Sequence, residues 1–139
     1  MKILKKILIA ILALVVIVLV IGFFSPRTVI LARSVTINAS ASSVFEEFNS
    51  VKPRQKWCPW AKIDPDGTEY TCEGPETGVG SKVTWVSEHP DVGTGIQSIV
   101  ESIDNQKVRT ELYFGGFDEP SYADLIITED GESTNVTWT

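Results

Sequence analysis

The sequence contains few of the side chains that most often bind metal ions or carry out catalysis. It has one histidine, His89, and two cysteines, Cys58 and Cys72, in 139 residues. His89 lies in a Glu-His-Pro-Asp turn and no CxxC spacing accompanies it, whereas protein zinc sites gather several such ligands at short spacings. The sequence therefore predicts no metal site and no bound cofactor.

Catalytic sequence motifs are absent as well. The chain has no Ser-x-x-Lys, no Gly-x-Ser-x-Gly and no P-loop, and the glycine-rich residues 74–80 lack the Gly-Lys-Ser ending. Acidic residues on the expected strands fall on alternate positions beside turns, which is typical of a solvated face. No spacing brings two of them together as a general acid and base would require, so the sequence assigns no catalytic residue.

Basic charge is scarce outside the first 24 residues. These residues contain Lys2, Lys5 and Lys6 and no acid, so that 9 basic and 18 acidic residues remain, a net charge of −9. Nucleic-acid binding needs a basic face that displaces counterions. The composition therefore excludes nucleic acid as a partner of residues 25–139.

One long hydrophobic run is present, at residues 7–24, which are 18 residues without a charge. A helix of that length rises about 27 Å, close to the thickness of the hydrocarbon core of a bilayer. The alternative is a cleaved signal peptide, but its apolar region is usually about 7 to 15 residues long. The small-residue site near Ala32 also has the bulky Ile30 where cleavage needs a small side chain. We therefore expect an uncleaved, single-pass membrane anchor.

The charges that flank this run predict its orientation. Three lysines precede it, whereas Arg27 and Arg33 follow it. The positive-inside rule places the N-terminus in the cytoplasm and the rest of the chain on the extracytoplasmic side. We expect two parts, an anchor with a short linker at residues 1–32 and a folded domain at residues 33–139.

The domain begins with a strand near Val35 and a helix at residues 42–51, which Pro53 ends. The apolar residues of the helix form one stripe, which consists of Val44, Phe45, Phe48 and Val51. Period-two alternation and turn residues then predict further strands, at residues 68–73, 81–87, 94–103, 108–114, 122–127 and 136–138. The hairpin connections favour an antiparallel sheet, so the fold class is α+β.

Three motifs carry a family resemblance over residues 33–139: Trp57-Cys58-Pro59-Trp60-Ala61, the Gly78-Val79-Gly80 turn before Val83-Thr84-Trp85, and Thr134-Asn135-Val136-Thr137-Trp138. With the order of elements, they resemble the START-like polyketide cyclase/dehydrase (SRPBCC) superfamily. The resemblance implies a helix-grip fold, in which a curved antiparallel sheet surrounds a long C-terminal helix and encloses an apolar cavity. Since this sequence stops at Thr139, before such a helix, we expect the domain at residues 33–139 to be C-terminally incomplete, and a truncated reading frame is favoured over a partner that covers the sheet.

The large residues expected to face the sheet interior are the candidate ligand-binding set. They are Trp57, Trp60, Trp85, Thr110, Leu112, Phe114 and Trp138. For any single ring the alternative is plain core packing. Since Trp57 follows the helical segment directly, we expect it to be a core ring, and Trp60 to close the mouth of a pocket.

These features favour binding of a hydrophobic small molecule or lipid by a membrane-anchored domain. Two alternatives are an enzyme of the cyclase or aromatase kind, and a sheet that binds a protein partner through its open face. Buried, paired ionisable groups would favour the enzyme, an unbroken apolar lining would favour the hydrophobic ligand, and a shallow exposed face would favour the partner. Cys58 and Cys72 also leave two interpretations open, a disulfide outside the cytoplasm or two separate thiols.

The orientation can be tested by a reporter fusion. Alkaline phosphatase fused after Thr139 should be active, because the lysine excess before the apolar run places the domain outside the cytoplasm. A fusion that is expressed but inactive would reverse the assigned orientation.

Overall fold

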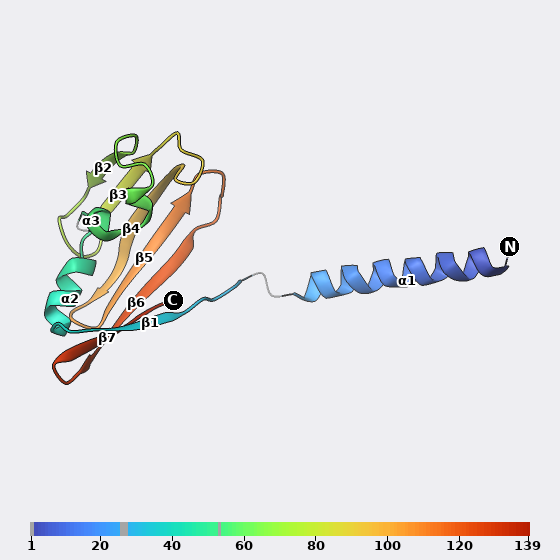
Figure 1. Ribbon diagram of the computed structural model, residues 1–139, viewed down its shortest axis with the longest axis horizontal. Coiled ribbons are helices and arrows are strands. Elements are labelled where there is room, and N and C mark those ends of the chain that lie inside the picture. Colours follow the sequence, from blue (N-terminus) through green and yellow to red (C-terminus); the bar gives the residue numbers. More distant parts are fainter. Residues whose placement is uncertain (1, 26–27, 53) are drawn as a thin grey trace. The chain divides into compact units, whose positions relative to one another are not determined.

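The computed structural model describes residues 2–25, 28–52 and 54–139. The chain divides into two units, Met1–Leu31 and Ala32–Thr139. The first contains one helix, and the second contains a sheet with short helices on one face (Figure 1). Each unit is described by itself below.

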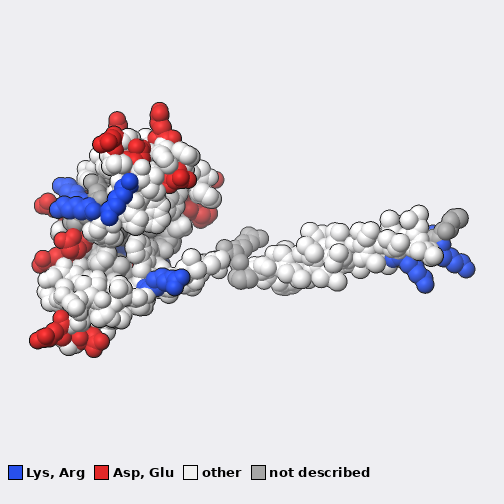
Figure 2. All heavy atoms as spheres, viewed as in Figure 1, with Lys and Arg blue, Asp and Glu red and all other residues white. Residues whose placement is uncertain are grey.

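The first unit is built around α1, Lys2–Phe24, a single helix of 23 residues with a mean hydropathy of 3.5 over its most apolar window. Its described side chains are exposed within the protein, although almost all of them are aliphatic or aromatic. Figure 2 shows the lysines gathered at the N-terminal end of this helix and no charge along the rest of it. By length and composition the helix can cross a membrane.

The second unit contains one seven-stranded antiparallel sheet with the order β1-β7-β6-β5-β4-β3-β2. The strands are β1 Arg33–Ile37, β2 Glu69–Glu73, β3 Lys82–Val86, β4 Thr94–Ile103, β5 Lys107–Phe114, β6 Ser121–Asp130 and β7 Ser133–Trp138. Consecutive strands pair as hairpins from β2 to β7 (Figure 1). The exception is β1, which pairs with β7 and so places Arg33 opposite Trp138.

The alternation seen in the sequence sets which side of each strand is buried. In β5, Val108 and Thr110 are buried and their neighbours are only half-buried. In β6, Leu125 and Ile127 are buried in the same way. Residues two apart on a strand share one face of the sheet, which explains this burial pattern. The antiparallel α+β fold expected from the sequence is confirmed.

The first helix of the domain, α2, Ala41–Phe48, is shorter at its C-terminal end than the apolar stripe predicts. Ser40 caps its N-terminus by accepting a hydrogen bond from the backbone N–H of Ser43. At the other end the chain is tied to the loop after β2, where the Ser50 hydroxyl donates to the Glu76 carbonyl. This tie takes the chain out of the helix before Val51. The expected role of Pro53 lies outside the described residues.

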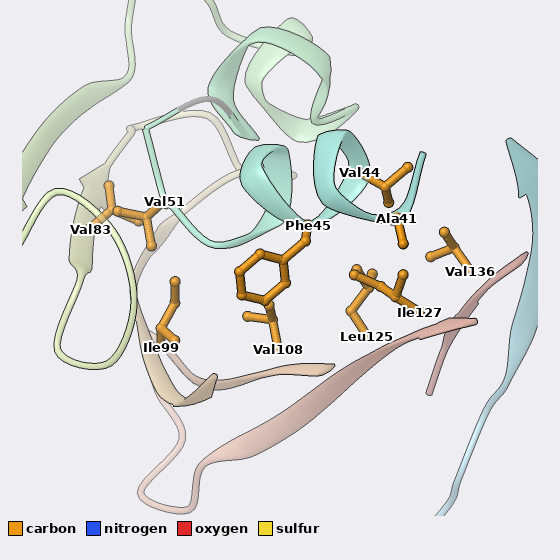
Figure 3. Packing of buried hydrophobic residues seen from close by; sticks show 10 residues of the cluster. All are labelled: Ala41, Val44, Phe45, Val51, Val83, Ile99, Val108, Leu125, Ile127 and Val136. Carbon is orange, nitrogen blue, oxygen red and sulfur yellow. The ribbon is translucent and has the colours of Figure 1, made fainter. Parts of the chain in front are cut away.

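The core lies between α2 and the middle of the sheet, since α2 contacts β5, β6 and β7 (Figure 3). Phe45 points from the helix towards Val108, and Val51 is buried although it follows the helix. The buried cluster consists of Ala41, Val44, Phe45, Val51, Val83, Ile99, Val108, Leu125, Ile127 and Val136. Its members come from one helix, one loop and five strands, so the core depends on tertiary contacts throughout the domain.

Two further short helices, which sequence periodicity does not predict, follow α2. They are α3, Arg54–Trp57, and the 3₁₀ helix η1, Trp60–Lys62. The turn at Asp64 comes next, where the carboxylate accepts from the Gly67 N–H and the carbonyl accepts from Thr68. Helices this short carry too few turns to show an apolar stripe, which explains why the pattern predicts a simple turn here.

The position of Phe45 generates a stability prediction. Phe45→Ala should lower the free energy of unfolding by about 3–5 kcal/mol, because it removes a buried ring between α2 and β5. Glu46→Ala, on the exposed side of the same helix, is the control and should change the stability by less than about 0.5 kcal/mol. Denaturant unfolding of the full chain, followed by circular dichroism, measures both. Equal effects of the two substitutions would contradict the packing of α2 on the sheet.

Candidate functional site

The candidate site lies on the inner face, which we define as the sheet face that α2 covers in part. Strand pairing places its residues beside one another across β3, β4, β5 and β6. Trp85 is opposite Gly95, Gln97 is opposite Leu112, and Thr110 is opposite Ala123. Because α2 contacts only β5, β6 and β7, it leaves part of this inner face uncovered.

A shallow apolar depression lies beside the C-terminal end of α2. Its lining consists of Phe48, Trp57, Val108, Thr110, Ala123, Leu125 and Trp138. Its volume is about 10 Å³, roughly the space of one water molecule. The depression is therefore a contact surface for part of a molecule and does not enclose a ligand.

Trp57 forms one wall of this depression. Its indole is half-buried and packs edge-on against Phe48, with ring centroids 5.1 Å apart and an interplanar angle of 69°. This geometry is a favourable aromatic arrangement. Phe48 belongs to the apolar stripe Val44, Phe45, Phe48 and Val51, so the indole of Trp57 contacts that stripe.

Trp85 and Phe114 form a second aromatic pair farther along the inner face. Their ring centroids are 6.0 Å apart at 72°, and the Trp85 indole N–H donates to the Val92 carbonyl at 3.4 Å. The Trp85 ring lies directly over Gly95, so that a side chain at position 95 would collide with it. The absence of a side chain at Gly95 therefore allows the indole of Trp85 to lie against the backbone of β4.

The polar groups between these two aromatic pairs are few. The Gln97 amide donates to the Thr110 hydroxyl at 3.3 Å, and that hydroxyl lies 3.4 Å from the Ala123 carbonyl, to which it donates. Thr110 is buried, and Gln97 is half-buried. The inner face here thus carries one short chain of hydrogen bonds in otherwise apolar surroundings.

The structure divides the predicted site residues into four groups. Trp57, Thr110 and Trp138 line the depression together, and Trp85 and Phe114 contact each other. Leu112 lies on the same face, opposite Gln97. Trp60 is 57% exposed in η1 and does not line the depression.

Four residues of the lining were not in the set expected from the sequence. They are Phe48, Val108, Ala123 and Leu125. The sequence assigned Val108 and Leu125 to the buried side of their strands, and that alternation was the available signal. It did not show which buried residues border an opening, because this depends on where α2 ends over the sheet.

Ionisable residues gather on the opposite, outer face. Lys107 bridges Glu101 at 2.7 Å and Asp124 at 3.6 Å, and Arg109 lies 3.6 Å from the same Asp124 oxygen. The hydrogen bond that Lys107 donates to the Glu101 carboxylate raises the pKa of Lys107. Arg109 also stacks over the Tyr122 ring at 4.8 Å. These groups form an ion-pair network on the surface, away from the depression.

The cysteines are both free, Cys58 half-buried and Cys72 exposed. Burial raises the pKa of the nearby Tyr70 hydroxyl, and Cys58 adds a smaller effect in the same direction. Cys72 borders a second cavity of about 150 Å³ between Val51 and the loop after β2. Within the described residues no group of three His, Cys, Asp or Glu side chains could hold a metal ion.

The chain is similar to several solved structures at low sequence identity. CalU16 from Micromonospora echinospora matches with a TM-score of 0.52 and 12% identity, over 77% of this chain and 56% of that chain. The Aha1 dimer from Colwellia psychrerythraea matches with a TM-score of 0.57 and 16% identity, over 80% of this chain and 74% of that chain. A protein from Staphylococcus epidermidis matches with a TM-score of 0.56 and 17% identity, over 78% of this chain and 68% of that chain.

These likenesses show the fold alone, and they support the helix-grip architecture that the sequence resemblance implies. The chain spans little more than half the length of CalU16. Comparison with models of protein families and with curated proteins finds no match. The function must therefore be argued from the site itself.

The two tryptophans of the Trp-Cys-Pro-Trp segment should differ in their contribution to stability. Trp57→Ala should cost about 2 kcal/mol, roughly half the loss for a fully buried ring, because Trp57 is half-buried against Phe48. Trp60→Ala should cost no more than about 0.5 kcal/mol, because most of its ring is exposed. Unfolding curves of the two variants compare them directly, and equal losses would show that both rings belong to the core.

Proposed function

We propose that the inner face binds a hydrophobic small molecule or lipid, with α1 holding the domain at a membrane. The observation that carries this proposal is the apolar lining of the depression, in which Thr110 is the only hydroxyl-bearing or charged side chain among the described residues. Ligand sites are typically lined by aromatic and aliphatic side chains with a few polar groups that fix orientation. The lining of this depression has that composition.

The mode of binding follows from the size of the depression. About 10 Å³ is far below the roughly 300–1,000 Å³ of pockets that enclose a ligand. The ligand would therefore lie along the inner face, with one apolar end in the depression and its length against the exposed rings of Trp138 and Phe114. These rings are 43% and 44% exposed, so both have area left to bury.

The possible membrane span at residues 2–24 favours the proposal that the ligand is a lipid or a lipid-like molecule. Residues 2–24 have the length and composition of a membrane span, and the lysine excess before them favours a domain on the extracytoplasmic side. The connector residues Val29, Ile30 and Leu31 are apolar and exposed as well. A domain joined to a bilayer by so short a connector meets hydrophobic molecules at high local concentration.

A protein partner on the same face is the second candidate function. It is favoured by the exposure of Trp60, Phe114 and Trp138, because tryptophan is enriched at the centres of protein interfaces. The cyclase-like alternative has less support, since the described residues that line the depression include no ionisable group to act as a general acid or base.

Ligand binding can be tested on the full chain. We expect native mass spectrometry of the detergent-solubilised protein to show a co-purified hydrophobic small molecule. Trp138→Ala should reduce its occupancy several-fold, because the variant removes one wall of the depression. Tyr122→Ala, which removes an exposed ring from the outer face, is the matched control and should retain the ligand.

Thermal unfolding of both variants shows whether each remains folded. Absence of any small molecule from the unmodified protein, or equal occupancy in the two folded variants, would contradict the proposal. Stoichiometric capture of a protein in place of a small molecule would favour the second candidate.

A further inference from the structure

The amide of Gln97 is the most polar group in the middle of the inner face. Gln97 is paired with Val83 on one side and Leu112 on the other, and Ile99 follows it on the same face of β4. A glutamine among such neighbours costs free energy unless its amide forms hydrogen bonds.

Only part of the hydrogen-bonding capacity of this amide is used. One N–H donates to the Thr110 hydroxyl. Among the described residues, the carbonyl oxygen and the second N–H of Gln97 have no hydrogen-bond partner within the protein. An amide offers two donors and one acceptor group, so one donor and one acceptor remain.

Thr110 cannot supply these missing partners. Its hydroxyl accepts from Gln97 and donates its single proton to the Ala123 carbonyl. This chain of bonds holds the amide next to the depression, because Thr110 and Ala123 both belong to the lining. Gln97 is thus oriented by Thr110 and keeps one donor and one acceptor for another molecule.

The described neighbours of Gln97 on the inner face are uncharged. Its cross-strand partners are Val83 and Leu112, and the described residues that line the depression include no acidic or basic side chain. A charged ligand group brought there would lose its hydration without meeting an opposite charge, and this is strongly unfavourable. The lysines and arginine of the ion-pair network lie on the outer face of the sheet.

We propose that Gln97 is the specificity-determining residue of the inner face and selects an uncharged apolar ligand that carries a hydroxyl group. A hydroxyl both donates and accepts, and so matches the acceptor and the donor that Gln97 retains. A carboxylate or an ammonium group is disfavoured at the same place. This inference rests on the proposed hydrophobic binding and adds the chemical class of the ligand.

The test compares three probes with chains of similar length: 1-decanol, methyl nonyl ether and decanoate. Binding to the full chain in nanodiscs of a zwitterionic phospholipid is followed by tryptophan fluorescence, with empty nanodiscs correcting for partition into lipid. We expect decanol to bind about fivefold more tightly than the ether, the effect of one net hydrogen bond, and decanoate to bind least.

Gln97→Leu should reduce the preference for decanol over the ether to about one while the ether still binds. Gln106→Leu makes the same chemical change at an exposed turn and should leave the preference unchanged. A direct readout is the side-chain amide signal of Gln97 in nuclear magnetic resonance spectra, assigned by its loss in Gln97→Leu. That signal should shift on addition of decanol, which a purely structural glutamine would not show.

The possible failures are distinguishable. If none of the probes binds, including the ether, the proposed hydrophobic binding itself is wrong. If the probes bind but Gln97→Leu keeps the preference for decanol, or decanoate binds most tightly, the role of Gln97 is overturned and the hydrophobic face remains. If Gln97→Leu does not fold, an unchanged Gln97 amide signal on addition of decanol to the unmodified protein overturns that role.

Discussion

The contact of α2 with the inner face of the sheet is the interaction on which the rest of the domain depends. An amphipathic helix of eight residues places Phe45 over Val108 and joins β5, β6 and β7 into one core. A sheet of seven strands offers more apolar surface than so short a helix can cover. The core is therefore compact at one end of the inner face, and exposed rings remain on the same face.

The segment after α2 shows how this limited cover is extended. The helix ends at Phe48, Ser50 is hydrogen-bonded to the loop after β2, and two very short helices follow. Trp57 then packs on Phe48 at the edge of the core, whereas Trp60 remains mostly exposed three residues later. The depression lies beside Trp57 and Phe48, where Thr110 is buried and Trp138 is partly exposed.

The two faces of the sheet separate the two kinds of chemistry in this protein. The ionisable side chains of β5 and β6, Lys107, Arg109 and Asp124, pair with one another on the outer face. From β3 to β6 the inner face has aromatic rings and uncharged polar groups, of which Thr110 and Gln97 are hydrogen-bonded to each other, whereas Arg33 of the edge strand β1 is paired with Trp138. Strand alternation produces this division directly, and it leaves the inner face suited to uncharged molecules.

The sequence by itself determined the apolar helix, the strand positions and the buried side of each strand, because these follow from local periodicity. The run at residues 94–103 became β4 with the expected bounds, and the alternation around Val108 placed that residue in the core. The family resemblance agreed with the architecture, although the likeness to solved structures stays below 20% identity.

Only the tertiary structure decided where the inner face is open. The end of α2, the pairing of β1 with β7 and the contact of Phe48 with Trp57 join segments that are distant in sequence or depend on loop geometry. The hydrogen bond of Gln97 to Thr110, and hence the amide groups of Gln97 that it leaves unused, likewise follow only from the pairing of β4 with β5. Periodicity shows which way a side chain points, whereas the residue that meets it is set by packing between elements.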